Sequence, residues 1–411
     1  MRVLMTVIPG HGHFHPVVPL ARALGQSGHE VRVATSASFA PTVERAGLSV
    51  ERAGLDWVES RPELVSPGVD MGSPRARAAE LMRIFNEVAP RAMVPDLLTL
   101  IESWRPDLLL FTLFELGGLL AAEMTDTPYV LLRNFIPAAL GRSHAPGGGG
   151  STEKPEWSAL NTFRSELGLR TFDPRGEAFP ALRYLDLDLV PPSLHLLAAQ
   201  NPLGTAHPLR PVHFSVPALG GGSFSEDGFA GPGPRLLVSL GTVFNDATDV
   251  ISAIVDGLSG VGRSLVVGLG NGTTGDVAPS ADMRFAPWAP FDVVLPGCDV
   301  LVTHGGWGSM MAALSHGVPM LVLPQAADNF VNALRVRSIG AGRFLAPPQV
   351  TASAVREEAA ILLSDPVYRL NALRLKDEIE AMPGPDAAVG LLERLARERA
   401  PVTSTMSFPR F

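Results

Sequence analysis

The first segment whose residue types could do chemistry is a histidine-rich loop, PGHGHFHP at 9–16, directly after an apolar run. A histidine at the end of a strand and beside a helix N-terminus can act as a general base, because the reference pKa of imidazole is near 6.5. Three histidines at i, i+2 and i+4 on an irregular loop do not give the geometry of a metal site. The loop therefore indicates base chemistry by one of its histidines. The alternative is that these histidines only cap or pack.

A second segment is rich in glycine, HGGWGS at 304–309, and lies between an apolar run at 299–303 and a helical pattern. A glycine-rich turn from a strand into a helix presents free backbone N–H groups and the positive end of the helix dipole, which together bind anions. His304 and Ser309 add side-chain donors, and no Gly-Lys-Ser/Thr follows, which excludes a P-loop. We expect phosphate binding here; the alternative is a glycine turn that serves tight packing.

These segments lie in two halves that each alternate short apolar runs with helical patterns, which is typical of parallel α/β sheets. Strands are predicted near 3–8, 30–34, 107–111, 129–132, 235–240, 264–268, 299–303 and 320–323. Helices are predicted at 16–27, 75–103, 116–124, 248–259, 309–315, 329–339 and 351–363. The fold class is therefore α/β, with two doubly wound, Rossmann-like domains facing each other across a cleft. Ligands of such sheets bind at the carboxyl ends of the strands.

A stretch rich in glycine and proline separates the two halves, and such residues break both kinds of regular structure. The predicted domains are an N-terminal domain at 1–216, a linker at 217–233, a C-terminal domain at 234–385, and a helix and tail at 386–411.

Composition excludes several classes of function. Of the 411 residues, 46% are hydrophobic and 18% are charged, which supports a buried core and excludes intrinsic disorder. The net charge of −8, with no long basic run, argues against a nucleic-acid partner. The single Cys298 excludes a disulfide framework. The first apolar run is too short for a signal peptide and the stretch 108–122 is too short for a spanning helix, so we expect no membrane partner and a cytoplasmic location.

The glycine turn belongs to a longer pattern, with WAP at 288–290, HGGWGS at 304–309 and DN at 328–329. This pattern resembles the donor signature of family 1 nucleotide-sugar glycosyltransferases. The resemblance covers nearly the whole chain, including GH at 12–13 with Pro16, SLGT at 239–242 and MPGP at 382–385. It implies the GT-B fold, in which the helix at 386–411 returns to the N-terminal domain. In detail the chain is most similar to the actinobacterial enzymes that attach deoxysugars to antibiotics.

The resemblance implies roles for residues at matching positions. His13 matches the catalytic base, which takes the proton from the acceptor hydroxyl. Trp288 matches the residue that stacks on the nucleobase, whose edge the Ala289 backbone reads. The other implied donor-binding residues are Gly12, Thr242, His304, Gly305, Gly306, Trp307, Gly308, Ser309, Asp328 and Asn329. Phenylalanines are most simply core residues, but an apolar acceptor pocket is the alternative, and for it we select Phe14, Phe85, Phe114 and Phe135.

Two departures from the family pattern bear on the mechanism. Where the family often has an aspartate that orients the catalytic histidine, this chain has Thr112, and the nearest carboxylate is Glu115. Either Glu115 substitutes, or His13 works with a hydroxyl partner or alone. Phe291 and Ala312 stand where relatives that use uridine donors have glutamine and glutamate, which favours a thymidine diphosphate (dTDP) donor.

The sequence therefore predicts an inverting, metal-independent glycosyltransferase that moves a sugar, preferably a deoxysugar, from a dTDP- or UDP-sugar to a hydroxyl of a hydrophobic natural product. Asn329, in place of the usual glutamine, fits a sugar with few hydroxyls. No cofactor is expected, and a homodimer is compatible with the sequence. Two alternatives stay open: a nucleotide-sugar epimerase of the same fold, and a non-catalytic auxiliary partner of another glycosyltransferase. Asp186 and Asp188 match a metal-binding Asp-x-Asp motif, but a structural role at a strand is the stronger interpretation.

Overall fold

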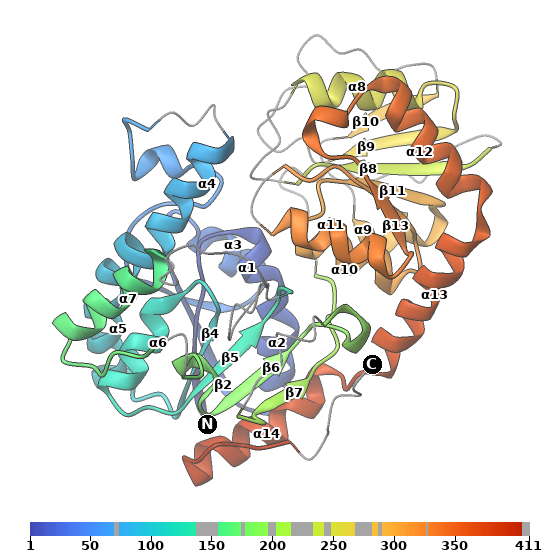
Figure 1. Cartoon of the computed structure of the whole chain (residues 1–411). Helices are drawn as coiled ribbons and strands as arrows, with labels where there is room; N and C mark the ends of the chain where they lie inside the picture. The colour runs from blue at the N-terminus through green and yellow to red at the C-terminus, as the bar shows by residue number, and fades with distance from the viewer. Residues whose placement is uncertain are drawn as a thin grey trace. The chain divides into compact units, whose positions relative to one another are not determined.

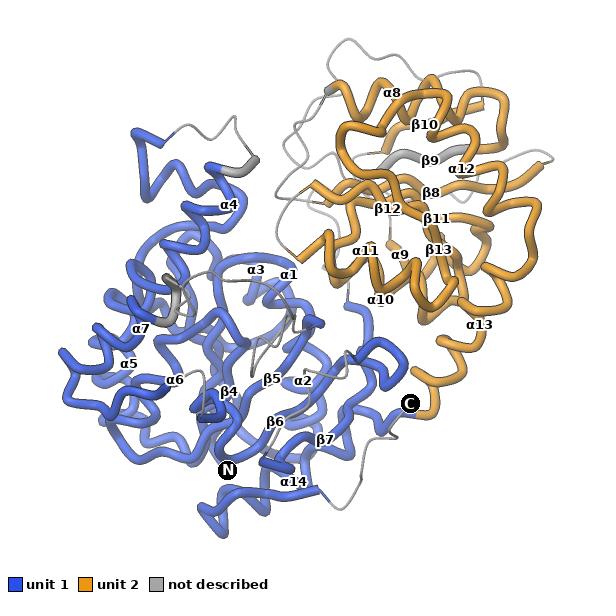
Figure 2. Tube along the Cα trace, viewed as in Figure 1, with its two compact units in different colours: residues 1–214, 382–411 blue, residues 215–381 orange. Residues whose placement is uncertain are grey.

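The computed structural model describes residues 1–69, 74–136, 155–173, 177–195, 203–214, 233–241, 248–267, 282–286, 290–325 and 328–404. The chain divides into two compact units (Figure 2), unit 1 with Met1–Phe214 and Met382–Phe411, and unit 2 with Ser215–Ala381. Of the predicted linker at 217–233, only residue 233 lies in the described part. Each unit is built around one parallel sheet (Figure 1), which confirms the predicted α/β fold class.

The sheet of unit 1 has seven parallel strands in the order β3-β2-β1-β4-β5-β6-β7. They are β1 (Arg2–Thr6), β2 (Glu30–Thr35), β3 (Ser49–Arg52), β4 (Leu108–Thr112), β5 (Tyr129–Arg133), β6 (Leu185–Asp188) and β7 (Ala206–Pro208). The central strands are apolar and buried along nearly their whole length, as expected of a parallel sheet covered on both faces. The strand order reverses between β1 and β4, which marks the switch point where doubly wound sheets bind ligands. The loops after these two strands carry His13 and Glu115.

The helices of unit 1 are α1 (His11–Phe14), α2 (Val18–Gln26), α3 (Ala40–Arg45), α4 (Pro74–Arg83), α5 (Ala89–Trp104), α6 (Leu116–Met124), α7 (Pro155–Glu166) and α14 (Pro385–Glu398). The single helix predicted at 75–103 is two helices, α4 and α5, joined by a π-helical turn at Ile84–Val88. Pro90, in the first turn of α5, has no N–H to donate, which accounts for the break. The last helix, α14, packs against α2, and His29 Nε2 lies 3.1 Å from Glu393 Oε1.

The sheet of unit 2 has six parallel strands in the order β10-β9-β8-β11-β12-β13. They are β8 (Arg235–Ser239), β9 (Arg263–Val267), β10 (Met283–Ala286), β11 (Val300–Thr303), β12 (Met320–Val322) and β13 (Gly342–Phe344). The helices are α8 (Thr248–Leu258), α9 (Phe291–Val294), α10 (Trp307–Ser315), α11 (Asn329–Ser338), α12 (Ala352–Ser364) and α13 (Pro366–Ala381). Here the order reverses between β8 and β11, and the turn after β11 is the glycine segment. None of the helices in the described residues is long and apolar enough to cross a membrane.

Candidate active site

The histidine loop of unit 1 follows β1 and is held in place by backbone and side-chain hydrogen bonds. Its second half is the short helix α1, in which the His13 N–H donates to the Gly10 carbonyl over 3.2 Å. From the end of β5, Asn134 Nδ2 donates to the Gly12 carbonyl over 3.1 Å. Gly12, predicted to bind the donor, thus has its carbonyl occupied by a residue of the same unit. Hydrogen bonds from the loop itself and from the end of β5 therefore fix the backbone that carries His13.

Aromatic side chains surround the His13 imidazole. The rings of Phe85 and Phe114 approach it edge-on, with centroids 5.9 and 6.1 Å away. Phe135 extends the group, since its ring centroid lies 5.9 Å from that of Phe114. Three of the four phenylalanines selected for acceptor binding thus gather next to the predicted base. The side chain of the fourth selection, Phe14, is fully buried and packs against Phe39.

A carboxylate that the sequence reasoning did not select lies beside His13. Glu59 Oε1 is 3.6 Å from His13 Nε2, and both side chains are largely buried, with 16% and 13% of their surface exposed. The Glu59 N–H donates to the Pro9 carbonyl over 2.9 Å, which ties the loop after β3 to the histidine loop. Gly10 leaves the space that the Glu59 carboxylate fills, because a Cβ at that position would overlap Glu59 Oε2. The other ring nitrogen, His13 Nδ1, is buried without a hydrogen-bond partner in the described part of the chain.

The two residues predicted to replace the family aspartate have other surroundings. Glu115 caps α6: its carboxylate accepts from the Gly118 N–H over 2.8 Å and from the Thr6 hydroxyl. The helix start and β1 thus hold the carboxylate that was one of the alternatives for a partner of His13. Burial raises the pKa of Glu115 above its usual value, against hydrogen bonds that lower it. The Thr112 hydroxyl is buried and has no hydrogen-bond partner among the described residues.

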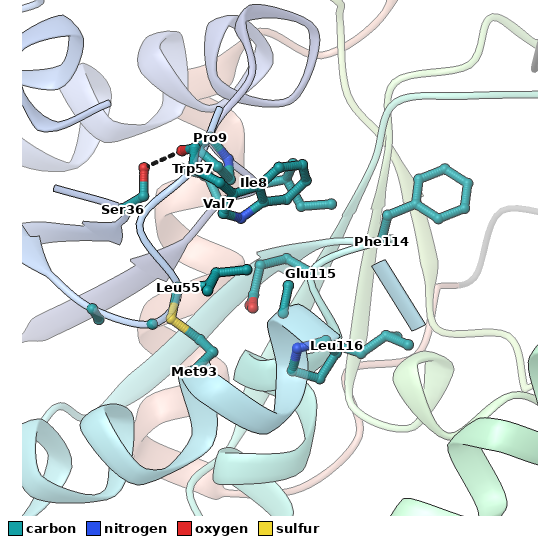
Figure 3. Close-up of a pocket in the computed structure, with 14 residues that line it drawn as sticks. Val7, Ile8, Pro9, Ser36, Leu55, Trp57, Met93, Phe114, Glu115 and Leu116 are labelled. Carbon is teal, nitrogen blue, oxygen red and sulfur yellow. Dashed lines mark hydrogen bonds between the residues drawn. The ribbon is translucent and has the colours of Figure 1, made fainter. Parts of the chain in front are cut away.

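Glu115 borders a small apolar cavity with Trp57, Met93 and Phe114 (Figure 3). The volume open to the centre of a water molecule is about 20 Å³, which is room for about one water. On one side of the cavity, the Ser36 hydroxyl donates to the Trp57 carbonyl over 2.6 Å and fixes the loop that leads to Glu59.

The other histidines of the loop form a pair. His11 Nδ1 lies 3.2 Å from His15 Nε2, and burial lowers the pKa of His15 to about 3. Burial also lowers the pKa of His11, although the charge of Glu59 opposes this shift. Both rings are therefore neutral near pH 7. No group of three or more residues suited to hold a metal occurs in the part of the chain that the structure describes.

In unit 2 the glycine turn runs from β11 into α10, as predicted. Gly305 has a φ of +89°, a conformation that favours glycine, and its N–H donates to the Thr303 hydroxyl over 3.3 Å. The His304 ring lies against Gly241 and Gly306, where a Cβ on either glycine would overlap it. Burial lowers the pKa of His304 to about 4, so the ring is neutral near pH 7. A hydrogen bond between this ring and the Ser239 backbone opposes the shift, so the donors that the turn offers to an anion are its backbone N–H groups.

Some of the other residues predicted to bind the donor lie at the start of α10, and others lie outside the described residues. Gly306 caps α10, Gly308 and Ser309 lie in its first turn, and Trp307 is 7% exposed and packs into the unit. Thr242, Trp288 and Ala289 lie outside the described residues.

The sequence reasoning missed Asn332, which joins the two donor segments. Its side-chain amide donates to the Gly305 carbonyl over 2.9 Å and to Asp328 Oδ2 over 3.0 Å. Asn332 is fully buried on α11, which begins at Asn329 directly after Asp328. Its position four residues after Asp328, on the same helix face, is the signal that could have found it.

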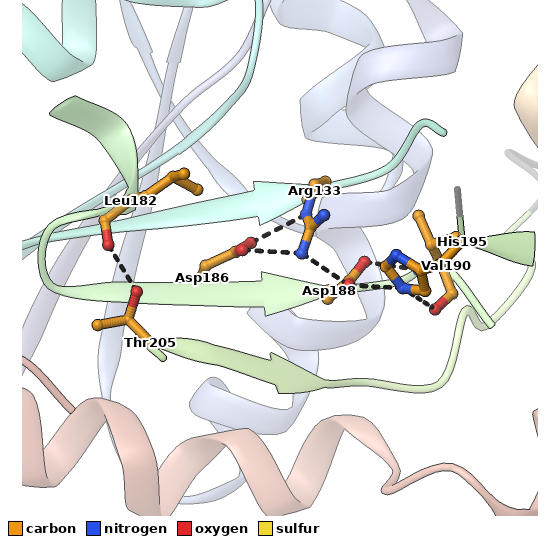
Figure 4. A network of polar contacts seen from close by, with 7 residues as sticks. All are labelled: Arg133, Leu182, Asp186, Asp188, Val190, His195 and Thr205. Carbon is orange, nitrogen blue, oxygen red and sulfur yellow. Dashed lines mark hydrogen bonds and ion pairs between the residues drawn. The ribbon is translucent and has the colours of Figure 1, made fainter. Parts of the chain in front are cut away.

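Asp186 and Asp188 form a buried ion-pair network at the carboxyl ends of β5 and β6 (Figure 4). Arg133 Nη2 lies 2.8 Å from Asp186 Oδ2 and 2.7 Å from Asp188 Oδ2, and His195 Nε2 lies 2.9 Å from Asp188 Oδ2. The two carboxylates are fully buried and compensated by the Arg133 guanidinium, which agrees with the structural interpretation of the Asp-x-Asp motif. Arg133 directly precedes Asn134, so the network also supports the residue that holds the histidine loop.

The chain is similar to known proteins in both sequence and fold. Two family models match, both described as erythromycin biosynthesis protein CIII-like, the N-terminal domain over 22–218 and the C-terminal domain over 252–395. The L-demethylnoviosyl transferase of Streptomyces niveus is 33% identical over 98% of this chain and 100% of its own. Among solved structures, the glycosyltransferase SnogD from Streptomyces nogalater has a TM-score of 0.70 and 26% identity, covering 96% of this chain and 99% of its own. Spinosyn rhamnosyltransferase SpnG, solved with thymidine diphosphate, has a TM-score of 0.73 and 26% identity, covering 96% of this chain and 100% of its own.

Proposed function

Because the chain belongs to the erythromycin biosynthesis protein CIII-like family of glycosyltransferases, we propose that it moves a deoxysugar from a dTDP-sugar to a hydroxyl of a hydrophobic natural product. The observation that carries the proposal is the group of phenylalanines around His13 at the carboxyl edge of the first sheet. Aromatic side chains bind apolar molecules, and an imidazole among them is placed to take a proton from a hydroxyl on such a molecule.

The reaction that fits this arrangement is a direct displacement. The His13 imidazole accepts the proton of the acceptor hydroxyl while the acceptor oxygen attacks the anomeric carbon of the sugar. The bond from that carbon to the diphosphate oxygen breaks, and its electron pair leaves with the diphosphate. Attack from the face opposite the diphosphate inverts the anomeric configuration. The proton on His13 then passes to solvent.

Stabilisation of the leaving diphosphate falls to the glycine turn of unit 2. The N–H groups at the start of α10 supply hydrogen bonds, which stabilise charge that develops on the leaving oxygens, and the neutral His304 ring packs against the turn beside them. These donors need no metal ion between them and the phosphates, so we propose metal-independent transfer. We further propose that Asp328 and Asn329 bind hydroxyls of the sugar.

A thymidine nucleotide is the proposed carrier of the sugar. Phe291, at the start of α9, has no side-chain hydrogen-bonding group, and neither has Ala312, which is fully buried in α10. A ribose 2′-hydroxyl would find no partner in either side chain. The SpnG structure with thymidine diphosphate supports the same choice of nucleotide.

One experiment tests the proposal in two steps with the purified chain. Thermal unfolding is measured with dTDP and with UDP, because a ligand at 100 times its Kd stabilises a protein by about 2.7 kcal/mol. We expect the larger shift from dTDP. The chain is then incubated with dTDP-deoxysugars and hydroxylated polycyclic aglycones, and the product is analysed by mass and by NMR of the anomeric proton.

The expected product is a glycoside whose anomeric configuration is opposite to that of the donor. A retained configuration would overturn direct displacement, and a larger shift with UDP would overturn the nucleotide assignment. An epimerised nucleotide sugar formed without acceptor would identify an epimerase. Transfer by the single purified chain would exclude a purely auxiliary role.

A further inference from the structure

The His13 ring lacks the aspartate that related enzymes often place after the strand corresponding to β4. Thr112 holds that position, and its hydroxyl has no hydrogen-bond partner among the residues described. Glu115, the next carboxylate along the chain, is held by Thr6 and by the start of α6. A group that favours the protonated ring must therefore come from another element, if the chain has one.

Glu59 meets the geometric requirements for such a group. Its carboxylate lies 3.6 Å from His13 Nε2, and neither side chain is exposed by more than 16%. Three constraints fix its position: the bond from its own N–H to Pro9, the bond from Ser36 to the Trp57 carbonyl, and the space left by Gly10. A loop carboxylate anchored at these points has little freedom to turn away from the ring.

We propose that Glu59 is the positioning residue for His13, in the role that related enzymes give to an aspartate after β4. The inference rests on the proposed function, in which His13 is the base. During transfer the neutral imidazole becomes an imidazolium, and a partly buried carboxylate next to it stabilises that charge and holds the ring plane. Glu59 itself touches neither substrate and accepts no proton in the net reaction.

Other charged groups lie near Glu59, among them Arg77, whose guanidinium donates to the carbonyl of the next residue, Ser60, over 3.0 Å. His11 on the same loop feels the negative charge of Glu59, and Arg45 on α3 is the other charged group that acts on His11. Both rings of the His11–His15 pair are neutral near pH 7 because they are buried. Neither ring of this pair therefore carries a charge that would compete with His13 for the Glu59 carboxylate.

The test compares Glu59→Gln and Glu59→Asp with the wild type. We expect Glu59→Gln to lower kcat about 10- to 100-fold with little change in dTDP affinity, because the loss falls on the charged transition state. The pH profile of kcat/KM should change as well, which a contact that only supports the fold would not cause. Glu59→Asp should recover part of the rate. A double variant, Glu59→Gln with Thr112→Asp, should recover more than Glu59→Gln alone, since a carboxylate then follows β4.

A matched control comes from the second histidine–glutamate pair of unit 1. Glu393, on α14, lies 3.1 Å from the His29 ring, and Glu393→Gln should leave kcat and its pH profile unchanged. A second control tests position rather than charge. Gly10→Ala should displace the Glu59 carboxylate and lower kcat, whereas Gly25→Ala, whose added Cβ meets nothing within 4 Å, should not.

The outcomes separate this inference from the proposed function. Activity in His13→Ala would overturn the base itself. Loss of activity in His13→Ala, with wild-type rate and pH profile in Glu59→Gln, would overturn the role of Glu59 alone. Glu59→Gln could also lose activity only because it is less stable to heat, with an unchanged pH profile. That result would show that Glu59 is a structural contact and would also overturn the inference.

Discussion

The carboxyl edges of the two sheets carry different kinds of chemical group at equivalent topological positions. At the edge of unit 1, between β1 and β4, the groups are titratable or aromatic side chains, with His13 and Glu59 at the centre. At the edge of unit 2, between β8 and β11, they are backbone N–H groups of a glycine turn and a histidine that burial keeps neutral. In the proposed reaction, the first edge changes its charge and the second keeps it.

The difference explains how an acidic protein can bind a dianion. The chain has a net charge of −8 and only two lysines, Lys154 and Lys376, so bulk attraction does not favour a diphosphate. A helix N-terminus with oriented N–H groups attracts the anion locally without a charged side chain. Substitutions at the first edge should therefore change the rate, and substitutions at the second should change donor affinity.

The largest expected effect is on transfer by His13→Ala. Removal of a general base costs about 10²- to 10⁴-fold in kcat, and dTDP affinity should stay near that of the wild type. His29→Ala serves as the control, because its ring also faces a glutamate, Glu393, but lies on the opposite edge of unit 1. Initial rates and calorimetric dTDP binding check both variants. A large loss of dTDP affinity in His13→Ala would contradict the proposal that the first edge affects the rate and the second edge affects donor affinity.

The next largest effect concerns the stability of the first edge. Arg133→Met leaves Asp186 and Asp188 buried without their guanidinium, which should lower the free energy of unfolding of unit 1 by about 3–5 kcal/mol. Arg91→Met, which breaks an exposed pair with Glu166, should cost less than about 1 kcal/mol. Urea unfolding of the two variants gives the comparison. Equal losses would mean that the buried network does not support the edge.

The sequence predicts the edges better than it predicts the contacts within them. Central strands such as β1, β4 and β11 are continuous apolar runs with glycine or polar residues after them, so their positions and the two loops follow from local pattern. The strands β3, β6, β7, β10 and β13 were not predicted, since each has only three or four residues, and β13 begins with Gly342. A short run that depends on its neighbours for stability leaves a weak local signal.

Side-chain partners were missed for a different reason. Glu59 reaches His13 through three separate anchors on β1, β2 and the loop after β3, and no spacing along the chain encodes that approach. Glu115 stood at a plausible distance in sequence, yet the free N–H groups at the start of α6 and the Thr6 hydroxyl hold its carboxylate. A carboxylate just before a helix is more often its cap, which local reasoning about α6 would have indicated.

A smaller effect is expected at the second edge from Gly306→Ala. The backbone of Gly306 is allowed for alanine, with φ −63° and ψ 148°, but the added Cβ would overlap the His304 ring. We expect dTDP affinity to fall about fivefold, because displacement of the ring disturbs the turn that forms the anion site, at a cost of about 1 kcal/mol. Gly308→Ala should weaken binding much less, since its Cβ meets nothing within 4 Å. Equal losses in the two variants would contradict the role of His304.

Asn332→Ala tests the link between the phosphate turn and the sugar-binding segment. Its loss leaves the Gly305 carbonyl and Asp328 without their shared donor, which should cost about 1–2 kcal/mol, seen as a higher KM for the dTDP-sugar than for wild type. Asn371→Ala is the matched control, because Asn371 also donates to a glycine carbonyl, that of Gly340, away from the turn. A KM that rises equally in both variants would point to general loosening of unit 2.

The smallest effect separates the two edges by pH. Burial lowers the pKa of His15 to about 3 in unit 1 and of His304 to about 4 in unit 2. In the unfolded chain these histidines have a pKa near 6.5 and become protonated as the pH falls below it. In the folded chain the rings stay neutral, so the free energy of unfolding falls as the pH falls. From pH 7 to 6 each ring should cost its unit about 0.7 kcal/mol.

His11 and His207, whose pKa values burial also lowers, add to the loss in unit 1, and the raised pKa of Glu115 opposes it. Native-state hydrogen exchange of β4 and β11 amides measures the two units separately. His15→Gln should flatten the pH dependence of β4 and leave that of β11 unchanged. A parallel change in both would mean that the two units do not unfold independently, so that protonation in one unit also lowers the stability of the other.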